Sequence, residues 1–93
     1  MSPVDGAARV VPRKNGNAGF RVLDGQAIIA VSGRSEVHLL NDVGTRIWQL
    51  IDGQRDEEQL AAEVEREFEV SLEQARRDVV EFVRNLTERG MIE

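Results

Sequence analysis

Alternating apolar and polar residues in the first half of the chain predict a β-hairpin. Two runs rich in strand-forming residues, 20–23 and 27–31, flank Asp24-Gly25. Both residues of an Asp-Gly turn tolerate the positive φ that a two-residue hairpin turn requires. Such a turn places Leu23 opposite Gln26. A second turn then leads into a third run at 36–40, so we expect a three-stranded antiparallel meander with a candidate open edge at its last strand.

From residue 41 onward the apolar spacing changes to that of a helix. Asn41 is a good N-cap, because its side-chain oxygen can accept a bond from an otherwise orphaned N–H of the first turn. The apolar stripe of this helix consists of Val43, Ile47, Leu50 and Ile51. Gly53 suits the end of the helix, where a left-handed residue is common. Gly44 in the first turn costs about 1 kcal/mol relative to alanine, which a close backbone approach to another element would explain.

Two further helices are predicted by their caps and apolar faces. Asp56 with Gln59, and Ser71 with Gln74, have the spacing of a capping box, and Gly90 ends the last helix. The second helix presents Leu60, Ala61, Val64 and Phe68, and the third presents Leu72, Ala75, Val79, Phe82, Val83 and Leu86. Three strands followed by three helices indicate an α+β domain, and this pattern is compatible with a winged helix.

The N-terminal part of the chain has no lasting hydrophobic period. Prolines, glycines and scattered charges predict a flexible arm over residues 1–18, followed by one domain over 19–93. The alternative is that Val10-Val11 lies along the sheet.

Composition narrows the function classes. Ninety-three residues with 41% hydrophobic content suit one globular domain, and no apolar run approaches the ~18–20 residues of a membrane span. The absence of cysteine excludes disulfides and thiolate metal sites and fits a cytoplasmic protein. A net charge of −5 argues against nucleic-acid binding, which favours a basic surface.

No residue pattern indicates catalysis. His38 is the only histidine, there is no cysteine or tyrosine, and no glycine-rich phosphate loop occurs. Glu36 shares a strand face with His38, but no further ligand converges on them by spacing. We therefore expect neither an enzyme nor a metal or other cofactor, and we interpret His38 as a surface or groove residue. Trp48, about 100° from Ile47 around the helix, is expected to be structural.

One line of residues on the third helix has two interpretations. Arg76, Val80 and Arg84 recur at i, i+4 and i+8, beside the core stripe of Val79 and Val83. A valine between two arginines suits a groove for a peptide with apolar and acidic side chains. The alternative is a solvated flank with one exposed valine, which is common on protein surfaces.

Several short motifs in fixed order resemble the signature of the PqqD family. They are Leu40-Asn41, Val43-Gly44, Ile47-Trp48, Asp52-Gly53 and Glu88-Arg89-Gly90-Met91-Ile92. The resemblance extends from about Phe20 to Ile92. Members of this family act as recognition elements for ribosomally synthesised and post-translationally modified peptides (RiPPs). In the name-giving system, the module presents the precursor peptide of pyrroloquinoline quinone (PQQ) to a radical S-adenosylmethionine enzyme.

The resemblance implies a winged-helix-like fold that binds the leader of a precursor peptide as an added strand. Carried onto this chain, it implies a docking edge at Glu36, Val37, His38, Leu39 and Leu40, and a wall at Arg76, Arg77, Val80, Val83 and Arg84. The implied partners are the leader peptide and a radical S-adenosylmethionine or other RiPP maturation enzyme. The pathway, PQQ or another, is left open. A monomer or weak homodimer is expected, without nucleic acid or membrane.

Two other functions fit the same pattern. A winged-helix DNA-binding regulator would use Arg76, Arg77 and Arg84 on a recognition helix. A dimerisation scaffold would instead pair the open strand edge with a second copy of the chain.

Overall fold

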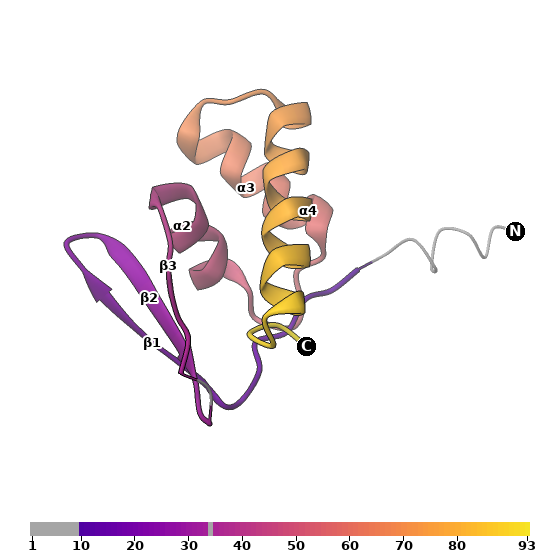
Figure 1. Ribbon diagram of the computed structural model, residues 1–93. Coiled ribbons are helices and arrows are strands. Elements are labelled where there is room, and N and C mark those ends of the chain that lie inside the picture. The colour runs from indigo at the N-terminus through magenta and orange to yellow at the C-terminus, as the bar shows by residue number, and fades with distance from the viewer. Residues whose placement is uncertain (1–9, 34) are drawn as a thin grey trace, which may run out of the picture.

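The computed structural model describes residues 10–33 and 35–93, which form a three-stranded antiparallel sheet followed by three helices (Figure 1). The strands are β1 (Ala18–Leu23), β2 (Gln26–Val31) and β3 (Val37–Leu39), in the spatial order β1-β2-β3. The helices are α2 (Asp42–Leu50), α3 (Glu57–Phe68) and α4 (Leu72–Glu88). The predicted α+β arrangement is thus confirmed, with the third strand shorter by one residue at each end.

The turn between β1 and β2 has the expected left-handed conformation. Asp24 has φ 53° and Gly25 has φ 81°, the two positive values of a type I′ turn. The register is also as predicted, because Leu23 pairs with Gln26 across the turn. This register turns Ala27, Ile29 and Val31 toward the helices, where all three are buried.

Each helix begins at the predicted cap. The Asn41 side chain accepts a bond from Gly44 N, and Asp56 forms a complete capping box with Gln59. At α4 the box is incomplete: the Ser71 side chain accepts a bond from Gln74 N, but the Gln74 side chain donates to Asp78 instead. Tertiary packing supplies most of the stability of helices this short.

The core lies between the inner face of the sheet and the three helices. Its largest fully buried side chains are Pro12, Ile29, Ile47, Trp48, Leu60, Val64, Val79, Leu86 and Met91. Thr45 of α2 links the helix directly to the sheet, since its Oγ1 accepts a buried bond from Ala27 N at 2.9 Å. The position of α2 relative to β2 is therefore fixed by a polar contact as well as by packing.

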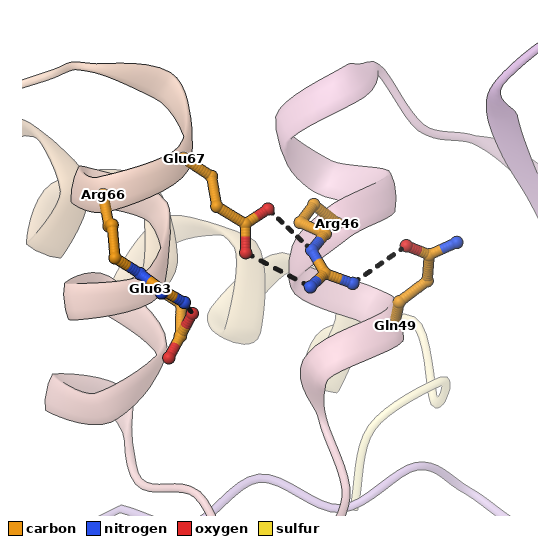
Figure 2. Close-up of polar contacts among 5 residues, drawn as sticks. All are labelled: Arg46, Gln49, Glu63, Arg66 and Glu67. Carbon is orange, nitrogen blue, oxygen red and sulfur yellow. Dashed lines mark hydrogen bonds and ion pairs between the residues drawn. The ribbon is translucent and has the colours of Figure 1, made fainter.

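Ion pairs at the surface connect α2 to α3. The guanidinium of Arg46 makes a bidentate contact with Glu67, at 2.8 and 3.2 Å, and also donates to Gln49 (Figure 2). Arg66 pairs with Glu63 within α3. The acidic face of α3 is thus partly neutralised by arginines. Such exposed pairs contribute at most about 1 kcal/mol each.

Residues 10–17 lie against the domain, although the sequence predicted a flexible arm here. Lys14 forms an isolated antiparallel bridge with Ile92, and Pro12 is fully buried. Figure 1 shows this indigo segment passing beside the yellow C-terminus. The correction has a physical reason, because backbone pairing with the last residues gives an aperiodic segment a fixed path. Of the rest of the predicted arm, Ala18 begins β1, and residues 1–9 lie outside the described residues.

Candidate functional site

β3 is paired along one edge, and no other described strand pairs with its second edge. Leu40 N donates to Ala27 O at 2.8 Å, directly across the ladder. Directly opposed residues alternate between bonded and non-bonded pairs in an antiparallel ladder, so His38 is the next residue that bonds to β2. The N–H and C=O groups of Val37 and Leu39 therefore point toward the free edge.

The side chains of this segment divide between the two faces of the sheet. Val37 and Leu39 lie on the outer face and are 65% and 60% exposed. His38 is half-buried on the inner face, and Leu40, at 4% exposed, belongs to the core. Of the predicted docking edge, residues 37–39 form the strand, while Leu40 serves as a core residue.

Contacts at both ends of β3 place α4 alongside the free edge (Figure 1). At one end, Arg89 Nη1, just after α4, lies 3.9 Å from Glu36 Oε1. At the other end, a Cβ built on Gly44 would lie 3.2 Å from Phe82 Cε1 of α4. The close approach that the sequence suggested for Gly44 is thus confirmed, and the approaching element is α4.

A groove with a volume of about 280 Å³ opens between the first turns of α2 and the middle of α4. Its α2 side consists of Asn41, Val43, Gly44 and Ile47, and its α4 side consists of Asp78, Glu81, Phe82 and Asn85. Because Asn41 follows β3 almost directly, the groove continues the free strand edge. A strand added to β3 would extend toward this groove.

The structure places the predicted α4 wall differently. Arg76 makes a bidentate ion pair with Glu58 of α3, at 2.8 and 3.0 Å, and Val83 is a core residue, 7% exposed. Val80, 45% exposed, is two residues from Phe82, a rotation of about 200° around the helix. The groove flank of α4 therefore does not include Arg76, Val80 or Val83.

Arg77 and Arg84 are exposed on α4 outside the groove lining. The residues that line or adjoin the cleft instead, Asp78, Phe82, Asn85 and Arg89, recur at i, i+4, i+7 and i+11. This spacing places the four residues on one flank of the buried stripe, and it can be recognised in the sequence. The sequence-based prediction of a wall used the opposite flank, whose arginines are the more conspicuous pattern, and its contact with a peptide stays a prediction.

His38 lies in a mixed electrostatic environment. Burial is the main cause that lowers its pKa below the ordinary value of 6.5, and the positive charge of Arg89 acts in the same direction. The carboxylate of Glu36 opposes the shift. Burial and the charge of Arg89 both favour the uncharged form of the imidazole.

A cluster of Lys14, Phe20 and Trp48 anchors the N-terminal segment. The Lys14 ammonium lies 5.0 Å from the Trp48 ring centroid and 5.5 Å from that of Phe20, and the two rings meet edge to face. Burial lowers the pKa of Lys14, partly opposed by Asp52. Trp48 is fully buried, and its Nε1 has no hydrogen-bond partner within the described part of the chain. The expected structural role of Trp48 is thus confirmed.

Within residues 10–33 and 35–93, no three side chains of His, Asp or Glu gather as a metal site would require. None of the described helices is long and apolar enough to cross a membrane.

Three solved structures have a fold similar to that of this chain. One, described as TbiB1 in complex with the TbiA(beta) leader peptide, has a TM-score of 0.79 and 21% identity, covering 87% of this chain and 94% of its own. Another, lasso peptide synthetase B1 complexed with the leader peptide, has a TM-score of 0.80 and 24% identity, covering 90% and 99%.

A third similar structure is the PqqD truncation of Methylobacterium extorquens PqqCD, described as a stand-alone RiPP recognition element. Its TM-score is 0.74 at 18% identity, with coverage of 89% of this chain and 88% of its own. At these identities the three likenesses establish the fold. No protein with a curated description matches the chain in sequence.

The family model described as coenzyme PQQ synthesis protein D matches residues 26–92. This range contains β2, β3, all three helices and each motif on which the resemblance rests. The chain belongs to the PqqD family.

Proposed function

We propose that this protein binds the leader segment of a ribosomally made precursor peptide and presents it to a modifying enzyme. The observation that carries the proposal is the free edge of β3, where the backbone groups of Val37 and Leu39 face outward beside α4. The leader adds to this edge as a fourth strand. The role is non-catalytic, in keeping with the PqqD family, and the binding energy comes from backbone pairing and side-chain contacts.

In strand addition, affinity and selectivity come from different groups of the protein. Hydrogen bonds from the backbone of β3 supply affinity for any extended segment, and pockets for alternate side chains supply selectivity. Here one set of leader side chains faces α4 and the groove, and the other set continues the outer face beside Val37 and Leu39. The leader loses conformational freedom on binding, so we expect micromolar to submicromolar affinity, about −8 to −9 kcal/mol.

Family membership and two of the similar structures, which are described as complexes with leader peptides, support this proposal. In the proposed site, residues 36–39 form the docking edge, and the groove flank of α4 replaces the wall inferred from sequence. Arg77 and Arg84 remain predicted contacts of the leader peptide outside the groove. The partner is a radical S-adenosylmethionine enzyme or another RiPP maturation enzyme, in the PQQ pathway or a different one.

The experiment measures binding of the N-terminal segments of short peptides encoded beside the gene. Fluorescence anisotropy with each labelled peptide should give saturable binding by one of them, and a scrambled version of that peptide should bind at least about tenfold more weakly. Duplex DNA at low salt serves as the competitor for the regulator hypothesis. Displacement of the peptide by DNA, or no preference over the scrambled sequence, would contradict the proposal.

A further inference from the structure

The cleft beside β3 differs in charge at its two ends. Near the start of β3, Arg89 lies within 3.9 Å of Glu36. Near the end of β3, the groove between α2 and α4 carries two carboxylates, Asp78 and Glu81. A strand added to the edge would therefore meet a negative field at the α2 end of the cleft.

The groove carboxylates lack the neutralising partners that other acidic side chains have. Glu58, Glu63 and Glu67 each pair with an arginine. Within the part of the chain that the structure describes, no ion pair includes Asp78 or Glu81. Asp78 Oδ1 accepts a bond from the neutral amide of Gln74 at 2.8 Å, which leaves the negative charge uncompensated. These two charges are available to a cation from outside.

The rest of the groove is mixed, with Asn41 and Asn85 beside an apolar part. Val43 and Phe82 are half-buried along its sides, and Ile47 is buried. A groove with apolar side walls and two carboxylates suits a side chain with a hydrocarbon stem and a cationic end. Lysine and arginine have this character, since they bury their methylene groups along apolar surface while the charged group reaches polar surroundings. An aspartate or glutamate of the peptide would be repelled by the same carboxylates.

We propose that the groove between α2 and α4 selects a lysine or arginine of the bound strand. This inference rests on the proposed function and specifies the chemistry of its ligand at one position. It differs from the sequence-based expectation of an acidic peptide, which relied on Arg76 and its neighbours. Continuity of the groove with the β3 edge supports the assignment, because Asn41 and Val43 come within four residues of the end of β3.

The test selects peptides from a random library displayed on phage, with the full-length chain as the immobilised target. Selected peptides should show lysine or arginine at one fixed position of their consensus. Replacing that residue by norleucine, or by citrulline for arginine, should weaken binding about twofold to fivefold. The loss should shrink in high salt, where exposed charges are screened within a few ångström.

Matched variants assign the effect to the groove. Asp78→Asn together with Glu81→Gln should remove the enrichment and reproduce the affinity loss. Glu73→Gln is the control, because it neutralises an exposed acid of the same helix outside the groove. This variant should leave the enrichment of basic residues and the peptide affinity unchanged. Glu81→Lys should restore binding to a peptide whose basic residue is replaced by glutamate.

The outcomes separate this inference from the proposed function. Peptides that bind and perturb the amides of Val37 and Leu39, but carry no basic residue at a fixed position, would overturn the inference alone. An equal loss from Glu73→Gln would also overturn it, because net charge would then explain the effect. Selected peptides that leave the amides of β3 unperturbed would contradict the proposed function itself.

Discussion

At the scale of single residues, Gly44 sets the distance between α2 and the groove flank of α4. A Cβ at this position would lie 3.2 Å from both Phe82 Cε1 and Asn41 Oδ1. The second of these atoms caps the helix by accepting a bond from Gly44 N. A larger side chain would therefore displace the groove wall or the cap, and the absence of a side chain offsets the low helix propensity of glycine.

Gly44→Val should destabilise the protein by about 1–3 kcal/mol, because overpacking forces neighbouring groups to move. Chemical denaturation measures the change in the free energy of unfolding. Gly19→Val is the control, since a Cβ there meets no atom within 4 Å, and it should change stability by less than about 0.5 kcal/mol. Similar losses from both variants would contradict the close approach at Gly44.

His38 should make the stability depend on pH below about 6.5. Its pKa is lowered in the folded protein, so the unfolded chain binds more protons as the pH falls through the ordinary value. Stability is therefore complete above this range and decreases on acidification. His38→Gln removes this contribution, and the difference in unfolding free energy between wild type and variant should change between about pH 7.5 and about pH 5.5. A constant difference would contradict the burial of the imidazole.

At the scale of elements, successive N–H groups of β3 point alternately to β2 and to the free edge. Proline should therefore have different effects at these two kinds of position. The N–H of Val37 points toward the free edge, so its loss leaves the ladder to β2 intact. Proline at an outward-facing position of an edge strand is tolerated for this reason. A substitution here can therefore separate peptide binding from folding.

Val37→Pro should weaken binding of the leader peptide by about tenfold or more, while the midpoint of thermal unfolding changes little. The binding loss comes from one missing backbone donor and from the ring that projects at the edge. Val37→Thr keeps the N–H and the branched side chain, and should bind almost as wild type. Undiminished binding by the proline variant would exclude strand addition at this edge.

The two flanks of α4 should differ in their effect on binding. Asn85 is exposed and lines the groove, whereas Val80 is exposed on the other side of the helix. Asn85→Tyr fills the groove and should weaken peptide binding by about tenfold, and Val80→Tyr should change it by less than about twofold. Isothermal titration with the same peptide measures both. The reverse order would restore the wall inferred from sequence.

Local rules predicted the elements because each depends on residues close in sequence. The Asp24-Gly25 turn determined the hairpin register, and the caps at Asn41, Asp56 and Ser71 located the helix starts. The rotation of α4 depends instead on which side chain packs against another element. That information lies in the contact between Gly44 and Phe82, which are distant in the sequence, and the helix period alone does not specify it.

The path of residues 10–17 was missed for a related reason. Their contacts are backbone hydrogen bonds to the other end of the chain, such as Asn15 N to Met91 O at 3.0 Å. Backbone pairing of this kind leaves no hydrophobic period in the segment. The aromatic contact of Lys14 with Trp48 likewise joins residues that sequence spacing does not relate.

At the scale of the whole molecule, the described residues leave the edge of β3 unpaired. The N-terminal segment forms its bridge with Ile92 and does not extend the sheet at β3. A net charge of −5, together with Asp78 and Glu81 beside the edge, gives the cleft little attraction for nucleic acid. Both features favour a peptide over DNA as the ligand.

Hydrogen exchange at the amides of β3 tests the central claim most directly. In the free protein, the amides of Val37 and Leu39 should exchange rapidly, while that of His38 is protected by its bond to β2. Saturating leader peptide should slow Val37 and Leu39 by about tenfold or more and leave His38 nearly unchanged. Protection of Val37 and Leu39 before peptide is added, or no change on binding, would contradict strand addition at β3.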